Sequence, residues 1–206
     1  MSFNVDNVQK QKRIVSKTLA ASEANILLMQ ETKLDQIWQQ ELQKDFPGYK
    51  FALNAEDGYI EDFEDRIHKS NKPRQAGTGA LVSEELMETV TFKFGHTHRF
   101  HEISMPGLLL LNVYLPSDGD GVIKQEEFRQ CVSDLSEYIE DNKGTRHIVV
   151  CGDFNASKRQ KKRSRWRAIE DMMARHTLEP SIPGFTTNYN PNNCETTIDF
   201  IMTSPE

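Results

Sequence analysis

Short unbroken apolar runs alternate with amphipathic segments along this chain, and this alternation limits its fold more than any other feature. Residues 26–29, 108–111 and 148–151 are apolar throughout, which is typical of strands buried on both faces. Other segments repeat apolar residues at helical spacing, as helices with one buried face do. Because strands and helices alternate in this way, we expect a layered domain of the α/β or α+β class.

The expected strands and helices cover the chain from end to end. Strands are expected at residues 2–5, 26–29, 49–53, 79–83, 89–94, 101–104, 108–114, 148–151 and 197–202. Helices are expected at residues 8–24, at residues 34–46, between the 118–121 loop and the 142–144 turn, and from Trp166 up to Pro180. No internal repeat or linker divides the sequence, so we expect one domain over residues 1–206.

Composition excludes several classes of protein. No apolar run approaches the ~20 residues that a membrane helix needs, and the N-terminus lacks the layout of a secretory signal. The three cysteines, at positions 131, 151 and 194, form neither a disulfide framework nor zinc-ligand spacing, which favours a reducing compartment. We therefore expect an intracellular protein without a membrane partner, and the nucleus is one candidate location.

Charge is distributed unevenly along the sequence. The formal net charge of −6 argues against a protein coated with bases for nucleic-acid binding. However, residues 158–167 carry seven bases, and residues 56–65 carry six acids within a polar stretch that we expect to be a long loop. Such a basic run is either a solvated helix face or a surface that binds phosphates. The candidate nucleic-acid contacts are Lys158, Arg159, Lys161, Lys162, Arg163 and Arg165.

Polar side chains stand at the ends of several buried runs. Glu31 follows residues 26–29, Asp153 follows residues 148–151, and Asp199 lies within the last expected strand. If these strands end at one rim of a layered structure, their oxygen atoms would form the ligand set that Mg²⁺ prefers. Each position taken alone is also typical of a helix N-cap or a turn. The hypothesis therefore depends on the whole set and its order.

Five motifs in a fixed order give the chain a specific resemblance. They are SFNVDN at residues 2–7, MQETK at 29–33, NVYLPS at 112–117, GDFN at 152–155, and FTT followed by TIDFI within 185–201. The set resembles the endonuclease/exonuclease/phosphatase superfamily, and within it the apurinic-type endonucleases and the endonuclease domains of non-LTR retrotransposons. The resemblance extends over residues 2–203. It implies a four-layered α/β sandwich of two packed, mostly antiparallel sheets flanked by helices.

The resemblance also implies roles for the motif residues. Glu31 would be the metal ligand with Asp6 close by, and the metal would be Mg²⁺, with Mn²⁺ as the alternative. Asn4, Tyr114 and Asn155 would contact phosphate oxygens and stabilise the charge that develops there. The implied reaction is hydrolysis of a phosphodiester in nucleic acid, and the expected partner is DNA.

The end of the sequence departs from the family pattern. By resemblance, Asp153 would align or deprotonate the attacking water, and Asp199 would orient a catalytic histidine. The family supplies that histidine from a Ser-Asp-His motif after a further strand, but the last histidine here is His176, in another context. We therefore expect a domain shortened at its C-terminus relative to the family, with Asp199 lacking its usual partner and one sheet edge open.

Two other motifs have simpler interpretations. His96, His98 and His101 could suggest a transition-metal site, but no carboxylate or cysteine accompanies them in the run. Residues 77–79 (GTG) lack the Lys-Ser/Thr of a phosphate-binding P-loop and indicate a turn before a strand.

Three functions stay open on sequence grounds. The first is a Mg²⁺-dependent DNA endonuclease of retroelement or apurinic type. The second is a catalytically impaired relative that acts as a nucleic-acid or protein-binding module. The third is a phosphodiesterase that acts on RNA or another phosphate ester.

Overall fold

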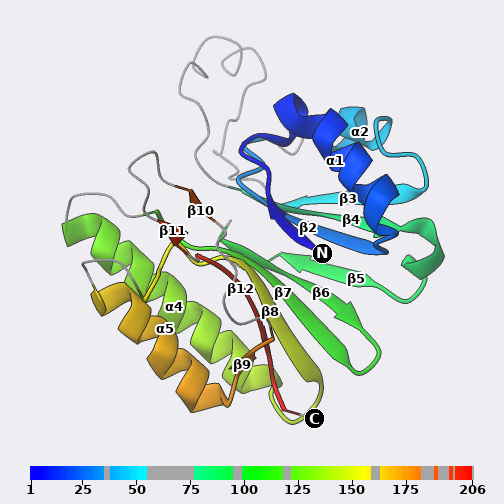
Figure 1. Cartoon of the computed structure of the whole chain (residues 1–206). Helices are drawn as coiled ribbons and strands as arrows, with labels where there is room; N and C mark the ends of the chain where they lie inside the picture. The colour runs from blue at the N-terminus through cyan, green and yellow to red at the C-terminus, as the bar shows by residue number, and fades with distance from the viewer. Residues whose placement is uncertain are drawn as a thin grey trace, which may run out of the picture.

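Two sheets stacked face to face form the centre of the protein. The computed structural model describes residues 1–34, 38–54, 77–94, 99–117, 122–158, 163–181, 188–189, 195–196 and 198–205. Within these residues one mixed sheet has four strands and the other six, and helices cover the outer face of each sheet (Figure 1). The order of layers is helix, sheet, sheet, helix. This arrangement confirms the expected α/β sandwich.

The first sheet has the strand order β1-β2-β4-β3. Its strands are β1 (Ser2–Asn4), β2 (Ile26–Gln30), β3 (Tyr49–Asn54) and β4 (Thr78–Ser83). β1 is parallel to β2, and the other two pairings are antiparallel. Helices α1 (Val8–Ser22) and α2 (Trp38–Gln43) lie over its outer face (Figure 1). A short 3-10 helix, η1 (Glu84–Leu86), follows β4.

The second sheet has the strand order β5-β6-β7-β8-β12-β9. Its strands are β5 (Thr91–Phe94), β6 (Phe100–Met105), β7 (Leu108–Tyr114), β8 (His147–Asp153), β9 (Glu179–Pro180) and β12 (Asp199–Thr203). β7 and β8 are parallel, and the other pairings in this sheet are antiparallel. Helices α4 (Val122–Asn142) and α5 (Arg163–His176) cover its outer face (Figure 1). Strands β10 (Asn188–Tyr189) and β11 (Glu195–Thr196) pair separately.

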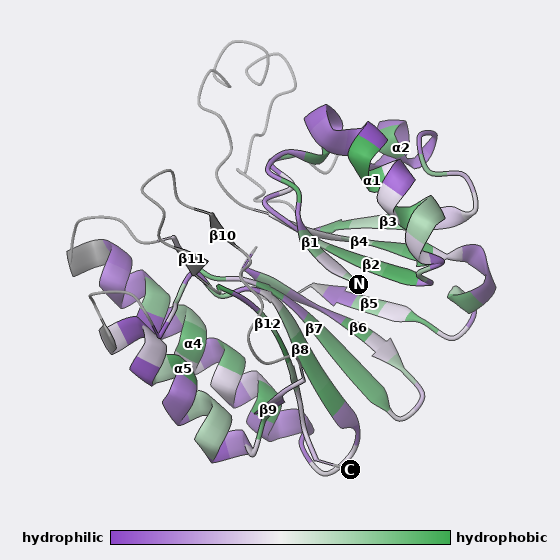
Figure 2. Ribbon diagram, viewed as in Figure 1, coloured by the Kyte–Doolittle hydropathy of each residue, from purple (hydrophilic) through white to green (hydrophobic). Residues whose placement is uncertain are grey.

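The continuous apolar runs form strands with both faces buried. In β8, Ile148 and Val150 pack into the cluster under α4 and α5, whereas Val149 and Cys151 face the interior between the two sheets. Figure 2 shows the same hydrophobic character along the neighbouring central strands. Because burying one such side chain contributes about 1.5–3 kcal/mol, these runs determine the layered packing.

The structure corrects two sequence-based boundaries. α2 begins at Trp38 and ends at Gln43, so Leu34 and Phe46 lie outside it. Both are nevertheless buried, at 4% and 2% exposure, because loops as well as helices can direct apolar side chains inward. Pro180 lies in strand β9, and α5 ends before it at His176.

Several expectations fall on residues outside the described ranges. These are the acidic stretch at residues 56–65, the histidines His96 and His98, and the FTT part of the fifth motif. Among the helices that are described, none is long and apolar enough to cross a membrane.

Candidate active site

Five strands bring the predicted polar residues to one end of the sandwich. β1 ends at Asn4, and Glu31 directly follows β2. In the second sheet, Asp153 at the end of β8 pairs with Tyr114 on β7 and with Asp199 on β12. The two sheets therefore each contribute part of the site.

Asn4 connects the two parts directly. Its side-chain Nδ2 donates one hydrogen bond to Glu31 Oε1 at 2.9 Å and another to Asp153 Oδ2 at 2.8 Å. Its Oδ1 accepts a hydrogen bond from the backbone N–H of Asp6 at 3.1 Å. One amide thus holds two carboxylates from different sheets and fixes the start of the segment that carries Asp6.

Asp153 is the buried acid of the site, with 2% exposure. Burial raises the pKa of Asp153 to about 7, and the nearby charge of Asp199 acts in the same direction. The backbone N–H of Asn155, which donates to Asp153 Oδ1 at 2.9 Å, and the side chain of Asn4 oppose this rise. A carboxyl with a pKa near neutrality can both accept and release a proton at physiological pH.

Tyr114 stays protonated in this environment. Burial raises the pKa of its hydroxyl, and the charges of Glu31 and Asp153 raise it further. The guanidinium carbon of Arg99 lies 5.4 Å from the centroid of the Tyr114 ring and opposes this rise. Tyr114 can therefore act as a hydrogen-bond donor, as the sequence analysis expected of a phosphate contact. Arg99 lies between His98 and His101 in the sequence, and no role for it was predicted from the histidines around it.

The two predicted metal-side carboxylates converge on one cation. Lys33 Nζ lies 2.9 Å from Glu31 Oε2 and also contacts Asp6 Oδ1. The described residues contain no group of three or more His, Cys, Asp or Glu side chains placed to hold a metal. Two carboxylates do fit a hard divalent ion such as Mg²⁺, which commonly takes its remaining ligands from water and substrate phosphate. Lys33 is the last residue of the MQETK motif, and no role was predicted for it from the sequence.

Left-handed backbone is concentrated around these side chains. Asp6, Glu31, Lys33 and Asn155 have φ values of 42°, 54°, 52° and 47°. Such conformations are unfavourable for residues other than glycine, and they persist where the surroundings fix them. The side chains of the site are therefore directed by backbone that the fold holds in place.

Gly152 allows β7 and β8 to approach each other beside Asp153. Its φ is +141°, and a Cβ at this position would lie 1.9 Å from Val113 O. Only glycine fits here. The close approach of β7 and β8 therefore requires the glycine of the GDFN motif, whatever chemistry the site performs.

The side chain of Asn155 points to the backbone in this structure. Its Nδ2 donates to Leu115 O at 2.9 Å, which ties the GDFN motif to the segment that follows β7. A phosphate contact by Asn155 stays a prediction.

A buried polar cluster lies between the sheets behind the site. Asn112 has no exposed surface, and its Nδ2 donates to Met29 O at 3.0 Å and to Gly79 O at 2.9 Å. Gln30 Nε2 donates to Asn112 Oδ1 at 2.6 Å. These hydrogen bonds join β7 to β2 and β4, so they fix the separation of β7, which ends at Tyr114, from β2, which Glu31 follows.

His101 belongs to the interior as well. It is fully buried, and its Nδ1 lies 2.8 Å from Thr78 Oγ1. Burial lowers its pKa to about 3, so the ring is neutral. Residues 77–79 were expected to form a turn before a strand, but β4 begins at Thr78, so only Gly77 precedes the strand.

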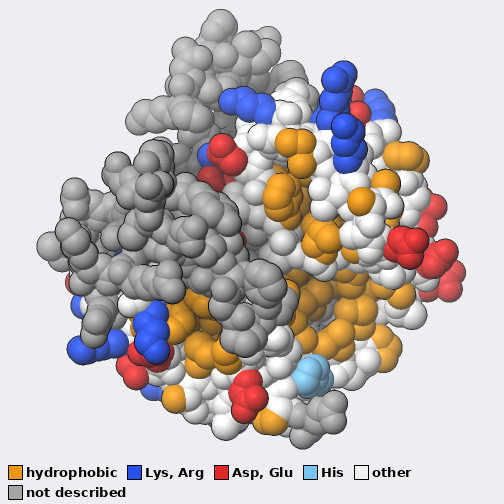
Figure 3. All heavy atoms as spheres, viewed as in Figure 1, with side chains coloured by type: hydrophobic (Ala, Val, Ile, Leu, Met, Phe, Trp, Pro, Cys, Tyr) orange, Lys and Arg blue, Asp and Glu red, His pale blue; other side chains and the backbone are white. Residues whose placement is uncertain are grey.

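The basic run divides into exposed and buried residues. Lys158 is exposed after β8, and Arg163 begins α5; Arg159, Lys161 and Lys162 lie outside the described residues. Figure 3 shows Lys and Arg side chains near α5 and, separately, near α1.

Arg165, one of the candidate nucleic-acid contacts, is buried in this structure. Arg165 is only 3% exposed, and its Nη1 donates to Pro116 O at 2.7 Å. Its guanidinium carbon lies 4.5 Å from the centroid of the Phe128 ring. The side chain therefore joins α5 to α4 and to the segment after β7, and a nucleic-acid contact by Arg165 stays a prediction.

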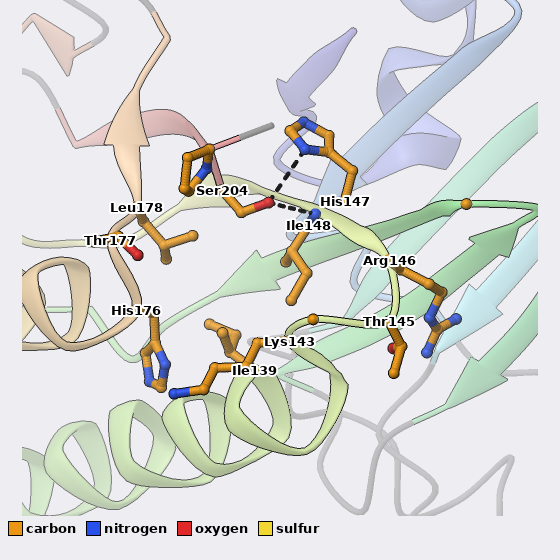
Figure 4. Close-up of a pocket in the computed structure, with 13 residues that line it drawn as sticks. Ile139, Lys143, Thr145, Arg146, His147, Ile148, His176, Thr177, Leu178 and Ser204 are labelled. Atoms are coloured by element: carbon orange, nitrogen blue, oxygen red, sulfur yellow. Dashed lines mark hydrogen bonds between the residues drawn. The ribbon is translucent and has the colours of Figure 1, made fainter.

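A pocket of about 660 Å³ lies at the other end of the second sheet, at the start of β8 (Figure 4). Ser204 Oγ accepts a hydrogen bond from Ile148 N at 2.9 Å and lies 3.2 Å from His147 Nδ1. The cations at its rim are paired, Lys143 with Glu140 and Arg146 with Glu102. This pocket is therefore separate from the candidate active site, which lies at the opposite end of β8.

The two-sheet sandwich and its cluster of acids and amides define a protein of the nuclease and phosphatase type. The sequence profile described as "Endonuclease/Exonuclease/phosphatase family" matches residues 1–206, and the chain belongs to this family.

Relatives and solved structures agree with this assignment. Two exodeoxyribonucleases from strains of Streptococcus pneumoniae are 25% identical over 182 residues, which cover 76% of this chain and 61% of the relatives. This chain thus matches less than two thirds of their length. A 3′ phosphatase from Neisseria bound to a product DNA hairpin superposes with a TM-score of 0.74 and 19% identity, covering 99% of this chain and 85% of that one. An AP endonuclease from Archaeoglobus fulgidus superposes with a TM-score of 0.72 and 18% identity, again covering 99% of this chain and 85% of that one.

Proposed function

We propose that this protein is a divalent-metal-dependent phosphodiesterase that cleaves nucleic acid, with DNA as its substrate and Mg²⁺ as its metal. The observation that carries the proposal is the position of Asn4, whose one amide group bonds to Glu31 and to Asp153. This contact joins a candidate metal ligand to a buried acid whose pKa is raised to about 7. Perturbed acids beside metal-type ligands are characteristic of catalytic sites.

Asp6 and Glu31 would hold the divalent cation. When bound, Mg²⁺ or Mn²⁺ would neutralise charge on the scissile phosphate and on the leaving oxygen. The exposed fractions of the two side chains, 73% for Asp6 and 22% for Glu31, leave room for water and for a phosphate oxygen.

The remaining site residues act on the phosphate and on the attacking water. Asp153 accepts a proton from water, for which its raised pKa makes it a stronger base than an ordinary carboxylate. Asp199 supports this role because its charge helps to keep the pKa of Asp153 high. Tyr114 donates a hydrogen bond to a phosphate oxygen as charge develops on it. Both donors of the Asn4 amide are directed to Glu31 and Asp153, so Asn4 positions these two acids beside the phosphate.

Two observations favour nucleic acid over other phosphate esters. Lys158 and the basic residues predicted after it directly follow the GDFN motif that carries Asp153. The relatives include exodeoxyribonucleases, and one structural neighbour was solved with a product DNA hairpin. A basic surface beside a phosphate site would position a backbone without reading its sequence. We extend the proposal to an intracellular endonuclease of apurinic or retroelement type.

Cleavage assays test the proposal directly. Supercoiled plasmid and a duplex with one abasic site are incubated with the protein and Mg²⁺, alongside Glu31→Gln, Asp153→Asn and the remote control Lys12→Met. We expect nicking by the native protein and by Lys12→Met, and a loss of at least about 100-fold in the two site variants. Nicking that persists in both site variants would refute the assignment of the site.

Two further outcomes separate the alternatives. Retention of either DNA by the native protein without any cleavage would identify a binding module. Hydrolysis of bis(p-nitrophenyl) phosphate or an inositol phosphate, with neither DNA bound nor cleaved, would identify a phosphodiesterase with another substrate.

A further inference from the structure

The Lys33 ammonium lies where the two candidate metal ligands meet. Its Nζ is 2.9 Å from Glu31 Oε2 and contacts Asp6 Oδ1. The Lys33 side chain is only 23% exposed, compared with 43% for Lys12 and 72% for Lys44, which pair with carboxylates elsewhere in the first sheet's helical layer. One partly buried ammonium thus contacts both carboxylates.

The backbone around Lys33 is held from two sides. Asn7 N donates to Glu31 O at 2.7 Å, which ties the segment to the start of α1. Thr32 N donates to Gly77 O at 3.2 Å, and the Thr32 side chain has no exposed surface. Lys33 itself has a φ of 52°. The direction of its side chain is therefore built into the fold and is not the chance position of a long surface residue.

The charge balance explains why such a contact is favourable without a metal. Asp6 and Glu31 are brought together by separate strands, and two carboxylates at one point repel each other. Partial burial alone would lower the pKa of Lys33, but its hydrogen bonds to Asp6 and Glu31 and their charges raise it above its usual value. The ammonium is therefore charged at physiological pH and compensates one of the two negative charges.

We propose that Lys33 is a tethered counter-ion that takes the place of the divalent cation in the metal-free protein and is displaced when the metal binds. This inference rests on the proposed metal site at Asp6 and Glu31. The ammonium and the metal compete for the same oxygen atoms, so each weakens the binding of the other by the same factor. Lys33 thus keeps the two carboxylates in position for the metal while it lowers their affinity for it.

Metal binding measured without any substrate tests this inference. Mn²⁺ is titrated by calorimetry into the metal-free full chain in its native form and as Lys33→Met, Lys33→Arg and Lys12→Met. We expect Lys33→Met to bind Mn²⁺ roughly tenfold more tightly, within the usual range of coupling between two sites. Lys33→Arg keeps the charge and is expected to bind within about threefold of the native protein. Lys12→Met removes the pair with Asp45 at 2.9 Å and is expected to leave the affinity unchanged.

Thermal unfolding supplies a second measurement. Without metal, Lys33→Met is expected to unfold at a lower temperature than the native protein, because two carboxylates lose their counter-ion. Saturating Mn²⁺ should then raise its Tm by more than it raises that of the native protein, because tighter binding gives a larger stabilisation. If Lys33→Met is poorly folded, Lys33→Gln is used for the same comparison.

Each result either supports or overturns the inference. An unchanged or weaker Mn²⁺ affinity in folded Lys33→Met would show that the ammonium does not compete with the metal. Glu31→Gln separates this failure from failure of the metal site itself. If Glu31→Gln leaves Mn²⁺ binding unchanged, Asp6 and Glu31 are not the metal ligands, and both proposals fall. If Glu31→Gln abolishes binding and Lys33→Met does not strengthen it, only the role of Lys33 is overturned.

Discussion

The protonation of Asp153 gives a prediction that can be worked through in numbers. Its pKa is raised from 3.8 to about 7, mainly by burial. Folding therefore favours the protonated form of Asp153. Its contribution to the free energy of unfolding is fully present below the unfolded-state pKa of 3.8. It is lost progressively as the pH rises from 3.8 to about 7. Above that range the native protein carries the cost of a buried carboxylate, about 4 kcal/mol at 1.36 kcal/mol per pKa unit.

Asp153→Asn removes the titration while nearly preserving the shape of the side chain. The variant loses one of the two hydrogen-bonded oxygens, so its stability at any single pH is not a clean measure. The change between two pH values is clean, because the lost hydrogen bond contributes equally to both. From pH 5 to pH 8 the stability of Asp153→Asn relative to the native protein should rise by about 2.5 kcal/mol.

Urea unfolding of both proteins in EDTA, at half-unit steps from pH 4.5 to 8.5, measures this difference. Asp199→Asn is the informative partner variant, because it removes a charge that raises the pKa of Asp153. We expect its pH dependence to be displaced toward lower pH. A stability difference between native protein and Asp153→Asn that stays constant across this range would show that Asp153 ionises as an ordinary surface carboxylate, and the reasoning would be refuted.

Three further predictions concern packing and the basic run. Gly152→Ala should lower the free energy of unfolding by at least about 2 kcal/mol, measured by urea denaturation, because its Cβ would lie 1.9 Å from Val113 O. Asn112→Leu should cost about 3 kcal/mol in the same assay, because it leaves buried backbone and side-chain groups without hydrogen bonds. Lys161→Glu with Lys162→Glu should weaken DNA binding and reduce the slope of log affinity against log salt by roughly two, whereas Arg165→Met should destabilise the fold and leave that slope unchanged.

Most of the fold follows from the apolar pattern of the sequence. The runs at 26–29, 108–111 and 148–151 form the central strands β2, β7 and β8, because side chains on both strand faces are buried. The two-residue strands β9, β10 and β11 were not predicted. Strands this short carry no periodicity, and their pairing depends on the neighbouring chain.

The burial of Arg165 within the basic run could not be predicted from residue type alone. Arg165 was grouped with the other bases by charge, yet it stands four and seven positions before Ile169 and Met172. All three are buried, at 3%, 0% and 3% exposure, and they share the helix face that packs against α4. A long side chain can bury its stem and take its charge to a backbone carbonyl. Helical spacing was therefore a better guide to Arg165 than charge.

The site shows a different limit of sequence reasoning. The motifs identified Asn4, Glu31 and Asp153 separately, but only the packing of the two sheets reveals that Asn4 bonds to the other two. Lys33 stands two positions after Glu31 in the sequence, but its role could not be predicted from that position. Its contact with Asp6 depends on the left-handed backbone of the segment, which no periodicity in the sequence indicates.

Because residues from both sheets form the site, its geometry depends on the distance between the sheets. Glu31 belongs to one sheet and Asp153 to the other, and Asn4 can donate to both only while the sheets keep their spacing. The buried amides of Asn112 and Gln30 fix that spacing from behind, with hydrogen bonds that no solvent competes for. A buried polar cluster is a costly way to stabilise a core, since apolar residues of similar volume would serve as well. Its value here is geometric, because directional bonds set the distance between Glu31 and the buried Asp153, which apolar packing alone would leave less defined.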